Sequence, residues 1–316
     1  MYHPEGVVVA VLMIVGGLGV TAFASRSAID HAEHIIAATR LSPFVVGMLL
    51  LAIGTDLPEI ANSIAASLSG HGDINAGDSI GSAFTQSTLI MGLLPILGGV
   101  FLVSRSESGF VGGATVMALL FGALLMSDGY ISRLDGVLFI SFWIVSGWIA
   151  WAWVPSATLP TAPTSDGRSR PRDWALTLVA LAGVGLGAWV AVQGLVQLSE
   201  TVGLPEYIVG FLIAAIGTSL PELVVNTTAL RRGHATMAVG GLLGASLLDA
   251  TVSIGAGPLL APVAVTSSIA VPASLWAAAG LALATLLLAL RRRHDLWSAG
   301  GLLLIYAALV PVLLSL

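Results

Sequence analysis

The chain has 316 residues, of which 56% are hydrophobic and 9% are charged, with a formal net charge of −5 and no cysteine. Soluble domains carry about 25% charged residues, so this composition excludes a soluble fold and indicates a protein whose solvent is lipid. There is no basic run that would suggest nucleic acid, and the lack of cysteine excludes disulfides and thiolate metal sites.

Ten apolar segments follow one another along the chain, each long enough to cross a bilayer core of about 30 Å as a helix. We therefore predict an all-α polytopic membrane protein with ten transmembrane helices. No Lys or Arg precedes the first segment, so we expect a retained span and no cleaved signal peptide. The predicted spans are 6–26, 42–69, 75–103, 110–127, 134–155, 174–199, 206–230, 236–263, 268–290 and 297–315.

A single polar stretch, residues 156–173, divides these helices into five and five. It is rich in Pro, Ser, Thr and Arg, which is typical of a linker. We expect a first five-helix repeat at 1–155, the linker at 156–173, and a second repeat at 174–316.

All twelve basic residues are Arg, and the predicted helices place eleven of them on one side, with Arg133 opposite. Cytoplasmic loops retain positive charge. We therefore expect a multi-pass protein of the cell membrane with both termini outside and the linker 156–173 in the cytoplasm.

The two halves contain an internal repeat, because residues 45–92 align with 208–255 at a constant offset of 163 without a gap. The shared pattern is G-T-x-L-P-E followed by spaced glycines, beginning at Gly54 and at Gly217. Chance similarity between apolar helices would give Leu and Val matches instead. Since five helices is an odd number, the halves have inverted topology, an arrangement that places substrate near the membrane midplane at broken helices.

Five acids fall inside the predicted spans more than two residues from either end, while the Arg residues lie in predicted loops or at helix ends. A carboxylate at the bilayer centre costs at least about 2.5–3.5 kcal/mol, so it must be protonated, bind a cation or face a wet cavity. Glu59 and Glu222 each precede a loop glycine by eleven residues, which places both near mid-bilayer. The five acids are Asp56, Glu59, Asp78, Glu222 and Asp249.

Further oxygen ligands surround these acids in the sequence. Pro58 and Pro221 interrupt helical hydrogen bonding, and carbonyls one turn back, at Ala52 and Ala215, become candidate ligands. Carboxylates, hydroxyls and carbonyls without soft ligands are suited to Ca²⁺, Mg²⁺, Na⁺ or H⁺. Gln86 and Asp249 lie at a similar depth, and the candidate hydroxyls are those of Thr55, Thr218 and Ser219.

The paired motifs resemble the alpha repeats of the sodium/calcium exchanger family, within the cation/calcium antiporter superfamily. The short linker is similar to that of prokaryotic-type members. The resemblance implies alternating-access antiport of Ca²⁺ against Na⁺, or against H⁺ in some branches, with the first and sixth helices as a sliding gate. The implied ligands are Glu59, Glu222, Thr55, Thr218, Ser219, Ser82, Asp249, and the carbonyls of Ala52 and Ala215.

This chain departs from the family pattern at five positions of the motifs, one of which is Gly241, where the second repeat loses the usual Asn. Asp56 stands where a hydroxyl is usual, Asp78 where Asn is usual, and Gln86 where Asn or Asp is common, while Ala245 lacks a Ser hydroxyl. We hypothesise that Asp56 shares the site with Glu59, because two such close carboxylates cannot both stay ionised without a cation. That would favour proton coupling or a more strongly charged divalent site.

Other interpretations stay open from the sequence. Asp78, Asn62 and Asn226 could support the ligands, although helix–helix hydrogen bonding explains the two Asn equally well. A Ca²⁺/H⁺ or Mg²⁺ exchanger is an alternative, and an intramembrane aspartyl protease or a passive channel is an alternative of another class. We expect no enzyme activity, no cofactor, no nucleic acid and no obligate protein partner, with the lipid bilayer and small cations as the only partners.

Overall fold

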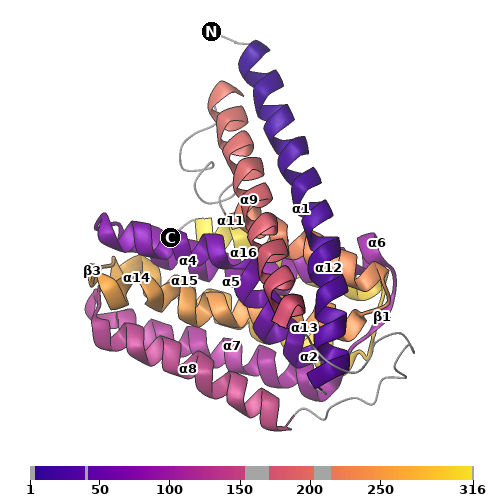
Figure 1. Ribbon diagram of the computed structural model, residues 1–316. Helices are drawn as coiled ribbons and strands as arrows, with labels where there is room; N and C mark the ends of the chain where they lie inside the picture. Colours follow the sequence, from indigo (N-terminus) through magenta and orange to yellow (C-terminus); the bar gives the residue numbers. More distant parts are fainter. Residues whose placement is uncertain (1–3, 40–41, 154–170, 203–214, 315–316) are drawn as a thin grey trace.

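The structure is a computed structural model that describes residues 4–39, 42–153, 171–202 and 215–314. This part of the chain is helical apart from short connections and four two-residue strands (Figure 1). Seven of its helices are long and apolar enough to cross a membrane, or eight if one bent pair is counted as a span. The architecture is that of an all-α polytopic membrane protein.

The described part of the first half contains eight α-helices, two π-helical turns, one 3-10 turn and two short strands. Its elements are α1 (Pro4–Thr39), α2 (Pro43–Val46), η1 (Gly47–Leu51), α3 (Ala52–Thr55), α4 (Leu57–Leu68), α5 (Gly72–Thr85), η2 (Gln86–Ile90), α6 (Met91–Gly98), β1 (Phe101–Leu102), α7 (Arg105–Leu125), η3 (Met126–Asp128), β2 (Tyr130–Ile131) and α8 (Arg133–Trp153).

The second half repeats this order of elements. They are α9 (Pro171–Val202), α11 (Ala215–Thr218), α12 (Leu220–Arg231), α13 (Ala235–Leu248), η5 (Asp249–Ser253), α14 (Ile254–Leu260), β3 (Val263–Ala264), α15 (Ser267–Leu290), β4 (Arg293–His294) and α16 (Leu296–Leu314). In both halves, π-helical turns (η1, η2 and η5) link α segments into longer continuous helices.

Several predicted boundaries are wrong. Helix α1 continues to Thr39, well past the predicted end at 26, so Arg26 lies inside a helix and not in a loop. The span predicted at 75–103 ends at Gly98, because Gly99 has a φ of 93° and strand β1 follows. Helix α9 begins at Pro171, inside the predicted linker; the rest of that linker and residues 206–214 of the seventh span lie outside the described residues.

Two short antiparallel strand pairs join the halves of the inverted repeat. Strand β1 pairs antiparallel with β4, and β2 pairs antiparallel with β3, so each two-stranded ribbon joins one half to the other. The turn glycines Gly70 and Gly233 are 163 residues apart and both have positive φ, at 77° and 88°. Equivalent elements therefore keep the offset found in the sequence.

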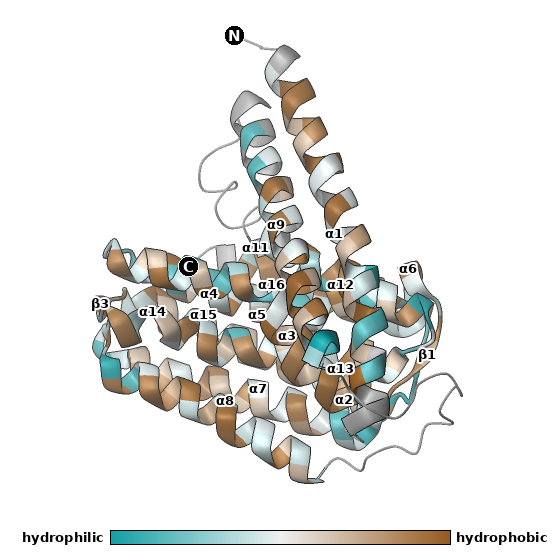
Figure 2. Ribbon diagram, in the orientation of Figure 1, coloured by the Kyte–Doolittle hydropathy of each residue, from teal (hydrophilic) through white to brown (hydrophobic). Residues whose placement is uncertain are grey.

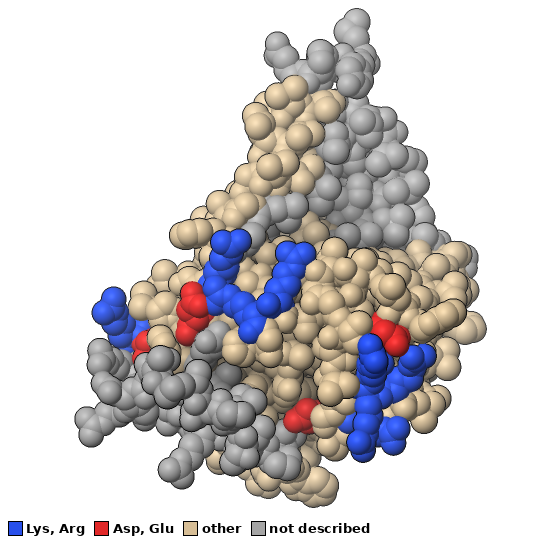
Figure 3. All heavy atoms as spheres, turned by 90° about the vertical axis from the view of Figure 1, so that its right-hand side faces the viewer, with Lys and Arg blue, Asp and Glu red and all other residues tan. Residues whose placement is uncertain are grey.

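The two ends of the bundle differ in charge. Exposed Arg side chains, which Figure 3 draws in blue, gather around the β1–β4 ribbon. We call this end the arginine face, and it consists of Arg105, Arg231, Arg232, Arg291, Arg292 and Arg293. Arg105 and Arg231 donate to carbonyls of Leu290 and Leu97 there. Arg133 lies at the opposite end, beside the β2–β3 ribbon.

Apolar side chains cover the sides of the molecule between these ends. Helices α1 and α8 are hydrophobic over most of their length (Figure 2), and large side chains such as Leu12, Phe23 and Trp148 are more than half exposed. Exposed apolar surface on this scale is a contact surface for lipid.

Helix α13 forms the centre of the core and is buried from Met237 to Leu248. Its glycines permit direct backbone contact with the α2–η1 segment: Gly240 lies against Phe44, and Gly244 against Met48. Small residues at such crossings allow van der Waals packing between helices in lipid, where the hydrophobic effect does not hold helices together.

Candidate cation site

Both G-T-x-L-P-E motifs form a broken helix. In the first, Asp56 separates α3 from α4 with φ −88° and ψ 7°, and the chain bends by 48°. In the second, Ser219 takes the same conformation between α11 and α12, with φ −82° and ψ 4°. The cause is the proline at the start of each following helix, which has no N–H to donate to the preceding turn. Each break turns a following Glu toward the interior.

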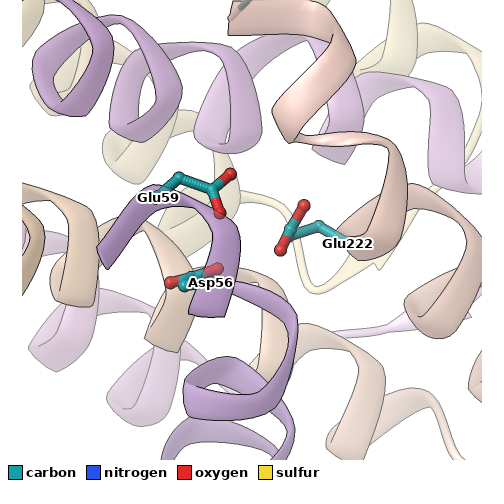
Figure 4. A group of neighbouring side chains, drawn as sticks. All are labelled: Asp56, Glu59 and Glu222. Carbon is teal, nitrogen blue, oxygen red and sulfur yellow. The ribbon is translucent and has the colours of Figure 1, made fainter. Parts of the chain in front are cut away.

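Three acids meet between the two breaks. Asp56, Glu59 and Glu222 each offer a carboxylate oxygen, and these oxygens lie within 4.8 Å of one another. Figure 4 shows the carboxylates of Glu59 and Glu222 turned toward each other across the gap between α4 and α12, with Asp56 beside them. All three side chains are at most 1% exposed. The structure thus places Asp56 and Glu59 in one cluster, and their shared role as ion ligands stays a prediction.

Most carboxylate oxygens in this cluster lack a partner among the described residues, although Asp56 Oδ1 accepts from the Thr55 hydroxyl at 3.4 Å. Both oxygens of Glu59, both of Glu222 and Oδ2 of Asp56 are buried and accept no hydrogen bond from the described residues. No salt bridge between described residues reaches them either. A buried charge without partners is strongly unfavourable, so the arrangement suits a bound cation that supplies the missing interactions.

A second pair of polar side chains joins the two halves. Gln86 Nε2 donates to Asp249 Oδ2 at 2.8 Å, and these residues are 163 apart, so they face each other across the axis that relates the repeats. Each is the first residue of a π turn, η2 or η5. Such turns often mark functional sites in helices. Gln86 Oε1 is buried without a partner and is a free acceptor.

The predicted hydroxyl ligands lie close to this centre with different partners. Thr55 Oγ1 donates to the carbonyls of Leu51 and Ala52, at 3.1 and 3.2 Å. The hydroxyl oxygens of Ser82 and Thr218 are 3.4 Å apart. The Ser219 hydroxyl is buried and has no partner among the described residues.

The two predicted carbonyl ligands differ in what the structure describes. The Ala52 carbonyl accepts from the backbone of Asp56 as well as from Thr55. Ala215 is the first residue of α11, and its side chain lies outside the description.

The remaining candidates are engaged with other groups. Asn62 Nδ2 donates to Asp78 Oδ2 at 2.6 Å, and Asp78 is not among the three acids that converge. Asn226 Nδ2 donates to the Glu222 backbone carbonyl at 2.8 Å, which fixes the turn that carries this Glu.

Sequence reasoning missed Ser253, whose hydroxyl donates to Asp249 Oδ1 at 2.9 Å. Together with Gln86, it gives both oxygens of Asp249 a partner. The i, i+4 spacing within one helix was the available signal, but the π turn that begins at Asp249 has no recognisable pattern in the sequence.

Comparison with known proteins gives a consistent result over nearly the whole chain. A family model described as "Sodium/calcium exchanger protein" matches residues 9–152 and again residues 173–314. A putative antiporter from Alkalimonas amylolytica, CaxA, is 25% identical over 262 residues, which is 80% of this chain and 82% of that protein. The sodium/calcium exchanger MaX1 of Methanosarcina acetivorans is 26% identical over 283 residues, which covers 75% and 79% of the two chains.

A solved structure shares the fold. It is the sodium-calcium exchanger NCX_Mj soaked with Na⁺ and Sr²⁺, which superposes with a TM-score of 0.77 at 26% identity. The match covers 96% of this chain and 99% of the other. The predicted architecture of ten transmembrane helices in two inverted five-helix repeats is confirmed by this likeness.

Proposed function

The chain belongs to the sodium/calcium exchanger protein family, and from this premise we propose that it exchanges Ca²⁺ for Na⁺ by alternating access at the Asp56–Glu59–Glu222 cluster. It is a membrane cation antiporter, and the protease alternative has no support, because the acids that converge include a repeat-related pair of Glu and not an Asp dyad. A passive channel is disfavoured, since conduction needs sites weak enough for the ion to leave.

One observation carries the proposal: five buried carboxylate oxygens at the centre of the bundle accept no hydrogen bond from the part of the chain that the structure describes. Ca²⁺ takes six to eight oxygen ligands, including carboxylates that bind through one or both oxygens. The same cation supplies the charge compensation that no described basic residue provides. Na⁺ would occupy overlapping positions when the divalent ion leaves.

In this proposal, Glu59 and Glu222 bridge the divalent ion and Asp56 adds a third carboxylate. Asp249 and Gln86 line the adjoining polar layer. The other oxygens of the shell come from Thr55, Thr218, Ser219, Ser82, and the carbonyls of Ala52 and Ala215. Asp78, Asn62 and Asn226 hold neighbouring turns in place and do not bind the ion.

The proposed topology follows the Arg distribution. The arginine face would be cytoplasmic, both termini would lie outside, and the linker within 156–173 would be cytoplasmic, between repeats at 1–155 and 174–316. A reporter enzyme that is active only outside the cytoplasm, fused at the C-terminus, tests this directly, and an inactive fusion would reverse the orientation.

The activity is tested with the purified protein in proteoliposomes. We expect uptake of ⁴⁵Ca²⁺ when Na⁺ is trapped inside, and no uptake when Na⁺ is equal on both sides. A parallel series with a proton gradient, and with Mg²⁺ in place of Ca²⁺, separates the two alternative exchangers. Uptake driven only by the proton gradient would replace Na⁺ by H⁺ as the coupling ion.

Asp56 is expected to set the strength of divalent binding. Asp56→Ser and Asp56→Asn each leave two carboxylates in the cluster, and ligand charge count tunes Ca²⁺ affinity over decades, so we expect the Ca²⁺ concentration for half-maximal uptake to rise about tenfold. The measurement is uptake against Ca²⁺ concentration at several pH values, with Glu107→Gln on α7 as a control. Unchanged Ca²⁺, Mg²⁺ and Na⁺ dependence in both variants at every pH would exclude Asp56 from the site.

A further inference from the structure

Helices α1 and α9 pack closely together, with one end of the pair against the bundle and the other end projecting from it. Figure 1 shows the two helices projecting together, away from the remaining elements. They pack backbone to backbone, because a Cβ at Gly17 would meet Gly187 and Ala191, and a Cβ at Gly194 would meet Ala10. Small residues at these crossings allow extensive van der Waals contact, which favours keeping the two helices together.

This pair lies over the broken helices that carry the acids. A Cβ at Gly54, one residue before Thr55, would collide with the Leu181 side chain on α9. Any displacement of the pair therefore changes what covers the cluster. The contacts that hold the pair against the bundle therefore influence from which end of the bundle an ion can reach the cluster.

On the side of the arginine face, two polar contacts hold α1 against α12. The hydroxyls of Ser25 and Thr228 are 3.2 Å apart. One turn further out, Asp30 forms an ion pair with Arg232, and their side chains are 54% and 31% exposed. Together these contacts link α1 to the last turn of α12 and to Arg232, the residue that follows it.

The repeat gives an internal comparison, because each of these residues has an equivalent 163 positions away. Ser25 and Thr228 correspond to Ala188 and Ala65, and Asp30 and Arg232 correspond to Gln193 and Ser69. None of these equivalents can form an ion pair. Thr228 is partly buried, whereas Ala65 is exposed, as are Ser69 and Gln193. Among the described residues, neither contact has a counterpart at the end opposite the arginine face, and Ala65 and Ser69 leave that side of α4 exposed.

We propose that Asp30–Arg232 and Ser25–Thr228 form a one-sided latch that keeps the route from the arginine face closed. Asp30 and Arg232 are positioning residues that act through α1 and do not touch the ion. The latch biases the ion-free protein toward the state in which the cluster opens to the opposite end, which the proposed topology places outside the cell. This inference rests on the proposed alternating-access function.

The size of the effect follows from the exposure of the ion pair. An exposed pair changes an equilibrium constant by at most about fivefold, and salt weakens it. The latch therefore biases the two states and does not lock one of them, as a transporter that must pass through both requires.

The absence of native cysteine makes a direct test possible. Val224 lies one turn from Thr228 on the α12 face toward α1, and its repeat equivalent on α4 is Ala61. Single variants Val224→Cys and Ala61→Cys would be labelled with a hydrophilic maleimide in detergent, where the reagent reaches both ends. We expect Asp30→Asn and Arg232→Gln to raise the labelling rate at position 224 about two- to fivefold and to lower it at position 61. The charge-swapped double variant, Asp30→Arg with Arg232→Asp, should restore both rates.

The labelling experiment tests the latch independently of the proposed transport function. Unchanged rates at both positions in the single variants, or a double variant that does not recover, would overturn the latch, whatever the transport activity. Because labelling needs no transport, a wild-type protein that shows no Ca²⁺ exchange would refute the proposed function while the labelling pattern still reports on the latch. Loss of the rate difference in high salt supports an electrostatic contact.

Discussion

Glu59→Gln and Glu222→Gln are each expected to reduce Na⁺-driven Ca²⁺ uptake at least about 100-fold, to the level of empty liposomes. Each change preserves the size of the side chain but removes a carboxylate whose two oxygens have no other partner. A divalent ion in a buried site needs that charge to replace its lost hydration. The measurement is initial ⁴⁵Ca²⁺ uptake, with Glu107→Gln, which replaces a carboxylate outside the cluster, as the matched control.

Thermal unfolding separates loss of binding from loss of folding in the same variants. Without ions, burial of an unpartnered carboxylate destabilises the protein, so the Gln variants should unfold at the wild-type temperature or above it. Added Ca²⁺ should raise the wild-type transition by mass action, worth about 2.7 kcal/mol at 100 times the dissociation constant, and should leave the variants unchanged. A Gln variant that keeps full exchange would remove its Glu from the site.

Gly240→Ala and Gly244→Ala are expected to destabilise the protein by about 1–3 kcal/mol or more each, the range for overpacking a core. A Cβ at Gly240 would lie 2.9 Å from the Phe44 Cα, and a Cβ at Gly244 would meet the Met48 backbone. Backbone cannot yield as the end of a flexible side chain can, so α13 would have to move away from η1. The measurement is the unfolding temperature in detergent by Trp fluorescence.

The matched control is Gly113→Ala on α7, where no described atom lies within 4 Å of the added Cβ. Higher helix propensity should leave this variant as stable as the wild type, or more stable by up to about 1 kcal/mol. Because Asp249 directly follows α13, the two core variants should also weaken Ca²⁺-dependent stabilisation. Core variants that unfold at the temperature of Gly113→Ala would contradict the packing assigned to α13.

The membrane class, the number of spans and the internal repeat can all be recognised in the amino-acid sequence. A bilayer imposes length and hydropathy on each crossing segment, so the spans can be recognised locally. The constant offset of 163 identified Glu59 and Glu222 as equivalents, and inverted topology followed from an odd number of helices. The broken helices were also predictable, because a proline near the start of α4 and of α12 acts on its own preceding turn.

The pairing of polar groups from different helices depends on the tertiary structure. Asp56 could be expected beside Glu59, three residues away, but the sequence offered no partner for Asp78, which the packing of α4 against α5 pairs with Asn62. Gln86 and Asp249 contact each other only because two hairpins cross at the axis between the halves. The unequal contacts of α1 and α9 could not follow from a repeat that makes the halves equivalent. These features depend on how helices far apart in the chain pack, and local patterns of hydropathy do not encode that packing.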